Sequence, residues 1–198
     1  MTRPGLSLLL CALGVLSVPA SAPAGDVALE PFAGFQYGGA FHSESGRRAE
    51  IGIGLQYGAN LDIPLFGEDR WGIDLFFARQ ETELEDAPRL GMAIERYMVG
   101  IREEKGDGRF RFRGNFYLGA SRFILDGLGS DVRFTGALGL GTSYAVSPRF
   151  GLRADARAYY AVVSFSGGTA CVNGNCLYVF GGSGVWQGDV TAGLQFRF

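Results

Sequence analysis

Residues 190–198 read V-T-A-G-L-Q-F-R-F, and apolar and polar side chains alternate along them without a break. A strict period of two residues requires a β-strand, because successive side chains of a strand point to opposite faces. One face of this strand is wholly apolar and the other is polar or glycine. Such a strand suits the wall of a barrel in lipid, where every backbone edge must be paired. We therefore expect residues 190–198 to pair with the first strand of the same chain.

The same alternation recurs along most of the chain. We expect strands at residues 33–42, 49–58, 71–77, 97–101, 110–121, 132–144, 150–162 and 190–198. An even number of strands with short connections fits an up-and-down barrel that has both ends of the chain at one rim. The predicted fold is all-β, an eight-stranded antiparallel up-and-down transmembrane β-barrel. Residues 60–69 read as a connection, although Leu61, Ile63 and Leu65 make it unusually apolar for a turn.

Alternation alone does not say which face lies outside, because a soluble lipocalin-like barrel would bury the apolar rows. Volume decides between the two arrangements. The interior of an eight-stranded barrel is just wide enough for side chains, and rows of Phe, Tyr, Ile and Leu would crowd it. The opposite rows mix arginine, aspartate and glutamine with many of the 32 glycines, which leave room for long charged side chains. We therefore place the apolar rows toward lipid and the polar rows in the lumen.

The start of the chain has the features of an export signal. Arg3 gives a short positive segment, residues 6–18 are almost wholly apolar, and residues 20–24 read A-S-A-P-A, with small residues suited to cleavage. We expect residues 1–24 to be a cleaved secretory signal peptide and residues 25–198 to form the single barrel domain. An uncleaved membrane anchor is the alternative, but the apolar segment is short against the roughly 20 residues of a spanning helix.

Charge and cysteine content narrow the classes of partner. Without residues 1–24 the chain loses Arg3 and no acidic residue. It then has 17 basic and 20 acidic groups, and its formal charge is −3. This is no footprint of nucleic-acid binding. Two cysteines then remain, Cys171 and Cys176, and an even pair in an exported protein predicts a disulfide. A metal site is the alternative, although no histidine or further cysteine is at hand to complete it.

The polar rows carry a set of charges that we predict to face the lumen. The set comprises Glu50, Asp74, Arg102, Arg111, Arg113, Arg133, Arg153, Asp155, Arg157, Asp189 and Arg197. Charges inside a membrane barrel can pair with one another or with water instead of hydrocarbon. One interpretation is a salt-bridged plug that holds the barrel in register. The other interpretation is a narrow water path that favours anions, because the set contains seven arginines and only four carboxylates.

The terminal strand resembles the C-terminal assembly signal of the small outer-membrane β-barrel superfamily, the OmpA/OmpX-like eight-stranded barrels of Gram-negative bacteria. Leu194, Phe196 and Phe198 carry that likeness, and residues 116–120 and 151–157 are similar to strands common in the group. The resemblance implies an outer-membrane β-barrel domain protein, inserted by the barrel-assembly machinery and surrounded by outer-membrane lipid and lipopolysaccharide. The resemblance indicates the location and the fold of the protein more specifically than its activity. We expect a monomer with no cofactor and no metal.

Some barrels of this architecture are enzymes that act on lipid A through a histidine and a serine. His42, the single histidine, precedes Ser43 in H-S-E-S, but adjacent residues point in different directions, whereas a catalytic triad needs converging groups. We therefore expect no enzyme and no catalytic residue. The predicted function is a structural or cell-surface interaction role. The glycine-rich loop around Cys171 and Cys176 suits recognition, and resistance to proteolysis is the equal alternative for its disulfide. A narrow pore is the first alternative and lipid A modification the second.

Overall fold

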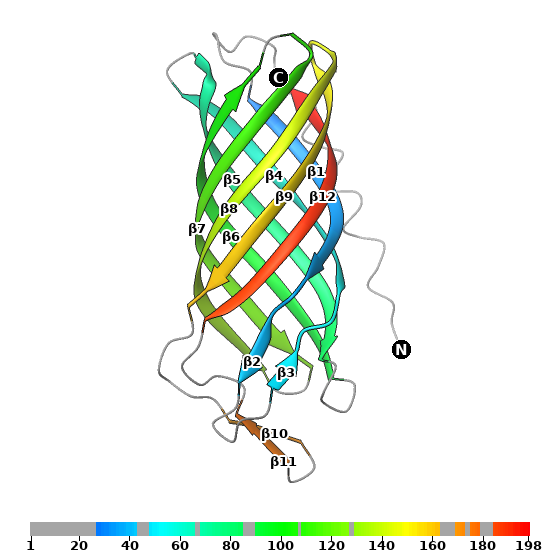
Figure 1. Cartoon of the computed structure of the whole chain (residues 1–198), viewed down its shortest axis with the longest axis vertical. Coiled ribbons are helices and arrows are strands. Elements are labelled where there is room, and N and C mark those ends of the chain that lie inside the picture. Colours follow the sequence, from blue (N-terminus) through cyan, green and yellow to red (C-terminus); the bar gives the residue numbers. More distant parts are fainter. Residues whose placement is uncertain are drawn as a thin grey trace.

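Eight long strands close into one antiparallel barrel, so the predicted fold is confirmed (Figure 1). The computed structural model describes residues 27–42, 48–65, 68–84, 90–106, 108–126, 129–162, 169–172, 175–178 and 184–198. Around the barrel the strands follow the order β1-β12-β9-β8-β7-β6-β5-β4. They are β1 (Ala28–Tyr37), β4 (Gly54–Leu65), β5 (Glu68–Leu84), β6 (Leu90–Lys105), β7 (Phe110–Leu125), β8 (Gly129–Ser147), β9 (Phe150–Ala161) and β12 (Val185–Arg197).

The last strand closes the barrel on the first, as the alternation in residues 190–198 predicts. β12 pairs antiparallel with β1, and Ala33 lies opposite Ala192 in that register. On its other side β1 pairs with β4, with Ala33 opposite Tyr57. Each barrel strand therefore has a hydrogen-bonded neighbour on both sides. This satisfies the backbone without water, as a lipid environment requires.

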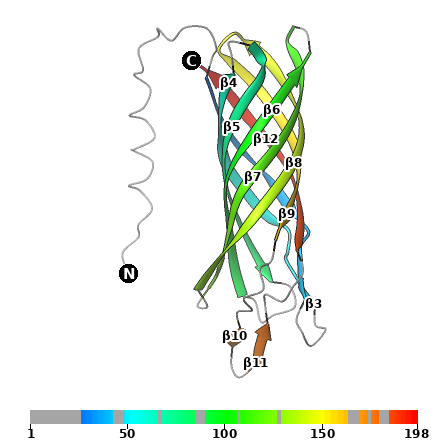
Figure 2. The same ribbon diagram turned by 90° about the vertical axis from the view of Figure 1, so that its left-hand side faces the viewer.

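The barrel has two different ends, which are visible in both views (Figures 1 and 2). The start of β1 and the end of β12 lie at one, here called the terminal end. At this end β8 and β9 are joined through residues 148–149, and β6 and β7 through residues 106–109. The opposite end, here called the loop end, carries two short hairpins. They are β2 (Ala40–His42) with β3 (Arg48–Glu50), and β10 (Thr169–Val172) with β11 (Asn175–Tyr178).

The first two strands differ in position from the sequence-based expectation. Residues 49–58 do not form one strand, because Arg48–Glu50 pairs with Ala40–His42 in the hairpin at the loop end. The wall strand β4 begins only at Gly54 and continues to Leu65. Leu61 and Ile63, which we expected in a connection, therefore lie in the wall, where they pair with Leu75 and Ile73 of β5. Their apolar character follows from this lipid-facing position.

The two faces of the wall differ as predicted from volume. The outward side chains are large and apolar, and Leu138, Leu140 and Phe112 are 65%, 75% and 63% exposed. Inward polar side chains such as Gln36 and Asp74 are fully buried. Within the described residues no helix is long and apolar enough to cross a membrane. The chain therefore presents mostly apolar side chains outward and keeps most of its polar side chains in the lumen.

Candidate functional site: the packed lumen

An aromatic layer crosses the lumen at mid-height. Phe32, Tyr159, Tyr117 and Phe76 come from β1, β9, β7 and β5, which are alternate strands around the barrel. All four are at most 6% exposed. The ring of Phe76 lies 5.6 Å from Phe32, 5.4 Å from Tyr117 and 6.3 Å from Tyr159, between ring centroids. Because β5 and β9 lie on opposite sides of the barrel, these contacts span its full width.

Two arginines stack on this layer. The guanidinium carbon of Arg157 lies 5.0 Å from the ring centre of Phe76 and 5.1 Å from that of Phe32. The guanidinium carbon of Arg96 lies 4.5 Å from the ring centre of Tyr159. A guanidinium at this distance is attracted by the ring quadrupole, more strongly where water is excluded. Both arginines are at most 3% exposed, so this layer of rings and cations is buried from bulk solvent.

The two tyrosines also anchor the layer to buried carboxylates. The hydroxyl of Tyr159 donates to Asp189 Oδ2 at 2.6 Å, and the same oxygen accepts from Gln56 Nε2 at 2.6 Å. The hydroxyl of Tyr117 donates to Asp74 Oδ2 at 2.8 Å. Buried carboxylates need such donors because an unpaired buried charge is costly. The hydrogen bonds fix the ring orientations that close the lumen.

A cluster of ion pairs fills the lumen between the aromatic layer and the terminal end. Glu30 lies at its centre and is fully buried. Its carboxylate accepts two hydrogen bonds from Arg113, at 2.9 and 3.0 Å, and one from Gln195 Nε2 at 2.7 Å. Arg153 Nη1 also donates to Glu30, while its Nη2 donates to Asp155 at 2.8 Å. One carboxylate thus ties β1 to three other strands.

A second group of ion pairs lies beside the first and faces the terminal end. Arg102 Nη1 donates to Glu104 Oε2 at 2.7 Å, and its Nη2 lies 2.9 Å from Asp62 Oδ1. Ser143 Oγ donates to the other oxygen of Glu104 at 2.9 Å. The side chains of Arg102, Asp62 and Glu104 are each at most 6% exposed. Asp62 and Glu104 thus share the guanidinium of Arg102. Arg113 Nη2 lies 3.7 Å from each of these two carboxylates and provides a second positive charge.

On the loop side of the aromatic layer the lumen contains amides and hydroxyls. Arg96 Nη1 donates to Gln36 Oε1 at 2.7 Å, and its Nη2 donates to Gln187. Thr135 Oγ1 donates to Ser121 Oγ at 2.7 Å. All five residues are at most 5% exposed. Polar groups therefore occupy the lumen on both sides of the aromatic layer, and many of them are hydrogen-bonded to one another.

The structure brings most of the predicted lumen charges together. Buried in the lumen lie Asp74, Arg102, Arg113, Arg133, Arg153, Asp155, Arg157 and Asp189. Arg111 and Arg197 are half-buried near the terminal end, where Arg197 donates to Gln195 Oε1 at 2.9 Å. Glu50 lies elsewhere. It belongs to the β3 hairpin at the loop end instead of the barrel wall, because β4 begins after it.

Sequence reasoning missed four buried charges of the lumen, namely Glu30, Asp62, Arg96 and Glu104. Each lay just beyond a strand boundary that was drawn too short, and extending the inward parity would have found it. With them the buried inward charges among the described residues are six carboxylates and six arginines. The predicted basic excess therefore disappears from the buried lumen. This removes the charge argument for an anion path.

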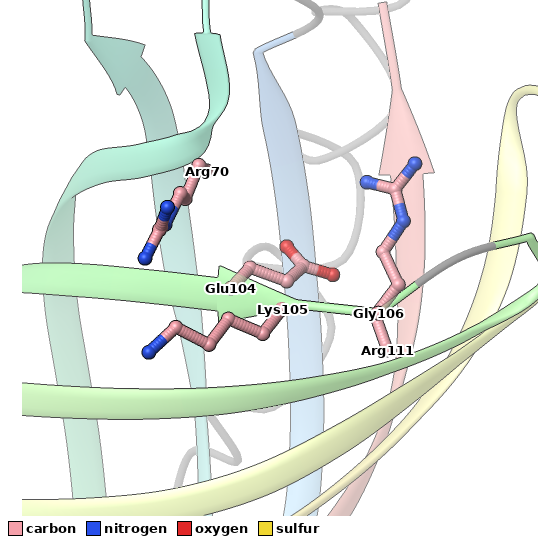
Figure 3. A pocket seen from close by; sticks show the side chains of 5 residues that line it. All are labelled: Arg70, Glu104, Lys105, Gly106 and Arg111. Carbon is pink, nitrogen blue, oxygen red and sulfur yellow. The ribbon is translucent and has the colours of Figure 1, made fainter.

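At the terminal end the lumen opens into a shallow mouth (Figure 3). Arg70, Glu104, Lys105, Gly106 and Arg111 line a hollow of about 470 Å³ there. Glu104 and Arg111 also line a second hollow of only about 40 Å³. Figure 3 shows Arg70 on β5, Glu104 and Lys105 at the end of β6, and Arg111 on β7. The mouth thus narrows abruptly toward the ion pairs around Arg102.

Two inward glycines show how the lumen accommodates its large side chains. A Cβ at Gly100 would lie 2.3 Å from Cδ1 of Tyr117, and one at Gly141 would lie 2.3 Å from Oδ1 of Asp155. Both separations are far below van der Waals contact. The glycines therefore leave the volume that the ring and the carboxylate occupy, in agreement with the expectation that small inward residues make room for long ones.

Some of the residues singled out in the sequence fall partly or wholly outside the described part of the chain. The backbone register of β10 and β11 pairs Cys171 with Cys176, but their side chains, like that of His42, are outside the described part. The disulfide therefore stays a prediction, as does the signal peptide, since residues 1–26 are also outside it. Among described residues, no cluster of three or more His, Cys, Asp or Glu is arranged to hold a metal ion.

Comparison with known proteins bears on the fold. No protein-family model matches the sequence, and no curated protein is similar to it in sequence. Among solved structures, the Neisserial surface protein A is 15% identical with a TM-score of 0.56, over 87% of this chain and 97% of that chain. The chain has the fold of the small eight-stranded outer-membrane β-barrels. The resemblance inferred from its terminal strand is confirmed at that level.

Two further structures with the outer-membrane barrel fold are also similar. The outer membrane protein OprG from Pseudomonas aeruginosa is 12% identical with a TM-score of 0.53, over 88% of this chain and 96% of that chain. The outer membrane protease OmpT from Escherichia coli is 11% identical with a TM-score of 0.49, over 92% and 99%. The likeness to OprG is one of fold, and the activity must be argued from the residues of this chain.

Proposed function

We propose that this protein is a non-conducting outer-membrane barrel that holds its loop end at the cell surface for interaction with a partner. The observation that carries this proposal is the aromatic layer across the lumen. Phe76 of β5 contacts Tyr159 of β9 from the opposite side of the barrel, and Arg157 stacks on Phe76. Rings that touch across the full width leave no continuous water column between the two ends.

The ion pairs support the same role. A conducting lumen needs charged groups that face water, whereas Glu30, Arg113 and Arg153 are nearly fully buried and bonded to one another. Removing one member of such a network leaves an unpaired buried charge, which costs about 3 to 5 kcal/mol. The network therefore fixes strand register and resists opening. This favours a structural lumen over the narrow pore that the sequence also allowed.

The arrangement of the connections supports the loop end as the interacting part. Outer-membrane barrels have short periplasmic turns and longer extracellular loops. Here the β10–β11 hairpin is carried by the connection between β9 and β12, and β2–β3 by that between β1 and β4 (Figure 1). Both are at the loop end, which we therefore orient outward. The described lumen contains no histidine or cysteine that could form a nucleophile–histidine pair, so we propose no enzyme activity.

Shortening the longest loop tests this function. Residues 163–183 are replaced by a short Asn-Gly turn, and cells that carry the variant are compared with wild type for phage adsorption and adhesion to immobilised host-matrix proteins. We expect wild-type amounts of heat-modifiable barrel and loss of at least one binding phenotype. Unchanged adsorption and adhesion, with the barrel fully assembled, would contradict a role for this loop.

A further inference from the structure

Charged side chains also lie on the outer, lipid-facing wall, in one row across three strands. Arg79 of β5 lies opposite Glu95 of β6, and Glu95 lies opposite Arg122 of β7. Arg79 Nη1 donates to Glu95 Oε1 at 2.7 Å, and Arg122 Nη1 lies 3.9 Å from Glu95 Oε2. These three residues are called the outer charge row. They face outward because the inward positions of β5 and β6 are the even-numbered ones, such as Asp74 and Arg102.

The carboxylate in the outer charge row is covered, whereas the arginines are open. The Glu95 side chain is 12% exposed, against 35% for Arg79 and 49% for Arg122. The Tyr97 hydroxyl donates to Glu95 at 3.2 Å, and Glu81, which is 62% exposed, pairs with Arg79 Nε at 3.3 Å. Each guanidinium has five N–H donors, so both keep donors for a further acceptor. Glu95, on the strand between them, thus pairs with one outward guanidinium on each side.

An apolar groove begins directly next to the outer charge row. The next row toward the terminal end places Phe77 opposite Tyr97, and the row after that places Leu75 opposite Val99 and Val99 opposite Leu118. These five side chains, with Gly119 and the inward Phe76 and Met98 at the base, line a hollow of about 380 Å³. The groove therefore lies in the lipid belt, with its loop-side edge at two arginines.

The rest of the circumference lacks this combination. On β8, β9, β12 and β1 the large exposed side chains near the loop end are apolar or aromatic, namely Val132, Tyr160, Val162, Trp186 and Tyr37. Aromatic residues of this kind are typical of the membrane interface. The outer charge row occupies the corresponding depth on β5, β6 and β7. An apolar groove that ends at exposed guanidiniums matches a lipid with acyl chains and an anionic head.

We propose that this site binds one phosphorylated glycolipid of the outer leaflet, with a phosphate at Arg79 and Arg122 and an acyl chain in the groove. Guanidinium binds phosphate through paired N–H donors, and such charge-assisted bonds are roughly twice as strong as neutral ones. The proposal rests on the outward orientation of the loop end that the proposed function assigns. It does not depend on what the loops bind.

Native mass spectrometry of the refolded full chain in detergent micelles tests the site. The probe is hexa-acylated, bisphosphorylated lipid A, and dephosphorylated lipid A is the comparator. We expect about tenfold tighter binding of the phosphorylated form, and loss of this preference in Arg79→Gln/Arg122→Gln. Arg70→Gln is the matched control, because Arg70 pairs with Glu103 at the rim of the terminal end, at the opposite end of the barrel from the outer charge row, and should leave binding unchanged.

A second pair of variants tests the groove. Val99→Trp fills it and should lower lipid A binding, whereas Leu140→Trp on β8, away from the groove, should not. Should the double arginine variant fail to refold, Arg122→Gln alone is measured. Arg122 has the longer pairing to Glu95, so its removal should disturb the wall least, and we expect lipid A affinity to fall about threefold. Equal binding of both lipid A forms, or wild-type binding by the refolded arginine variant, overturns the proposal. Neither result depends on conductance or on the loops, so the proposed function is tested separately.

Discussion

The carboxylate of Glu30 and the guanidinium of Arg113 form a bidentate ion pair across the lumen, with bonds of 2.9 and 3.0 Å. Glu30 is on β1 and Arg113 is on β7, and these strands lie four positions apart in the ring of eight. The pair therefore joins opposite walls of the barrel. It adds a side-chain link between the closing strand pair β1–β12 and the opposite strand β7, which neither of them reaches through backbone hydrogen bonds.

Removing the charge of Glu30 should destabilise the barrel strongly. In Glu30→Gln, Arg113 and Arg153 stay buried with their common acceptor neutralised, so we expect a loss of about 3 to 5 kcal/mol. Urea unfolding in detergent micelles, followed by tryptophan fluorescence, measures it. Glu103→Gln is the control, because Glu103 pairs with Arg70 on the outer wall and is 29% exposed. Such exposed pairs contribute about 0 to 1 kcal/mol, and equal losses in the two variants would refute the account.

Asp155→Ala should lower the temperature at which the folded barrel converts to the slower-migrating unfolded band in gel electrophoresis. Asp155 accepts from Arg153 and its carboxylate lies 3.5 Å from Arg157 Nη2, so both buried guanidiniums lose a negatively charged neighbour. Glu83→Ala, at an exposed position of β5, should leave that temperature unchanged. If the two variants melt alike, the lumen network does not stabilise the fold.

The outline of the fold followed from the sequence because alternation is a local property. Each lipid-facing row is visible in the residues themselves, and Leu194 and Phe196 lie outward with Gln195 inward, as their parity predicts. Strand ends were harder to place. They depend on the partner strand, so the shift of β4 to Gly54–Leu65 could not be derived from residues 49–58 alone.

The lumen could be predicted only in part. Parity identified Asp155 and Arg157 as inward, but it carries no information on height along the barrel axis or on which opposite residue is reached. The aromatic seal was missed for this reason. Phe32, Phe76 and Tyr159 are inward positions far apart in sequence, and their contact arises only from strand order and stagger. Side-chain partners across a lumen therefore require the three-dimensional structure.

Filling the space beside an inward glycine should be destabilising where a lumen side chain occupies it. In Gly141→Ala the new methyl would lie 2.3 Å from Asp155 Oδ1 and 2.9 Å from the Ala154 carbonyl oxygen. We expect a loss of about 1 to 3 kcal/mol in urea unfolding. In Gly114→Ala nothing lies within 4 Å of the new methyl, so stability should stay equal or rise. The reverse order of the two variants would show that the lumen is not packed as described.

Charge on the outward face should be costly at the middle of the wall. Leu138 lies at the centre of β8 and is 65% exposed, so Leu138→Arg should cost about 2 to 4 kcal/mol in lipid vesicles. Val146→Arg, near the terminal end of the same strand, should cost about 0 to 1 kcal/mol. Folding titrations into phospholipid vesicles compare the two. A larger cost for Val146→Arg would place the lipid belt elsewhere.

The sealed lumen is tested most directly by recording conductance across planar bilayers that contain the refolded barrel. The wild-type protein is predicted to give no reproducible unitary current, because the rings of Phe76 and Tyr159 meet across the lumen. Phe76→Ala/Tyr159→Ala, inserted in parallel and shown to be folded, should open a small, steady conductance. Reproducible unitary steps from the wild-type barrel, of the same size as those of the double variant, would contradict the seal.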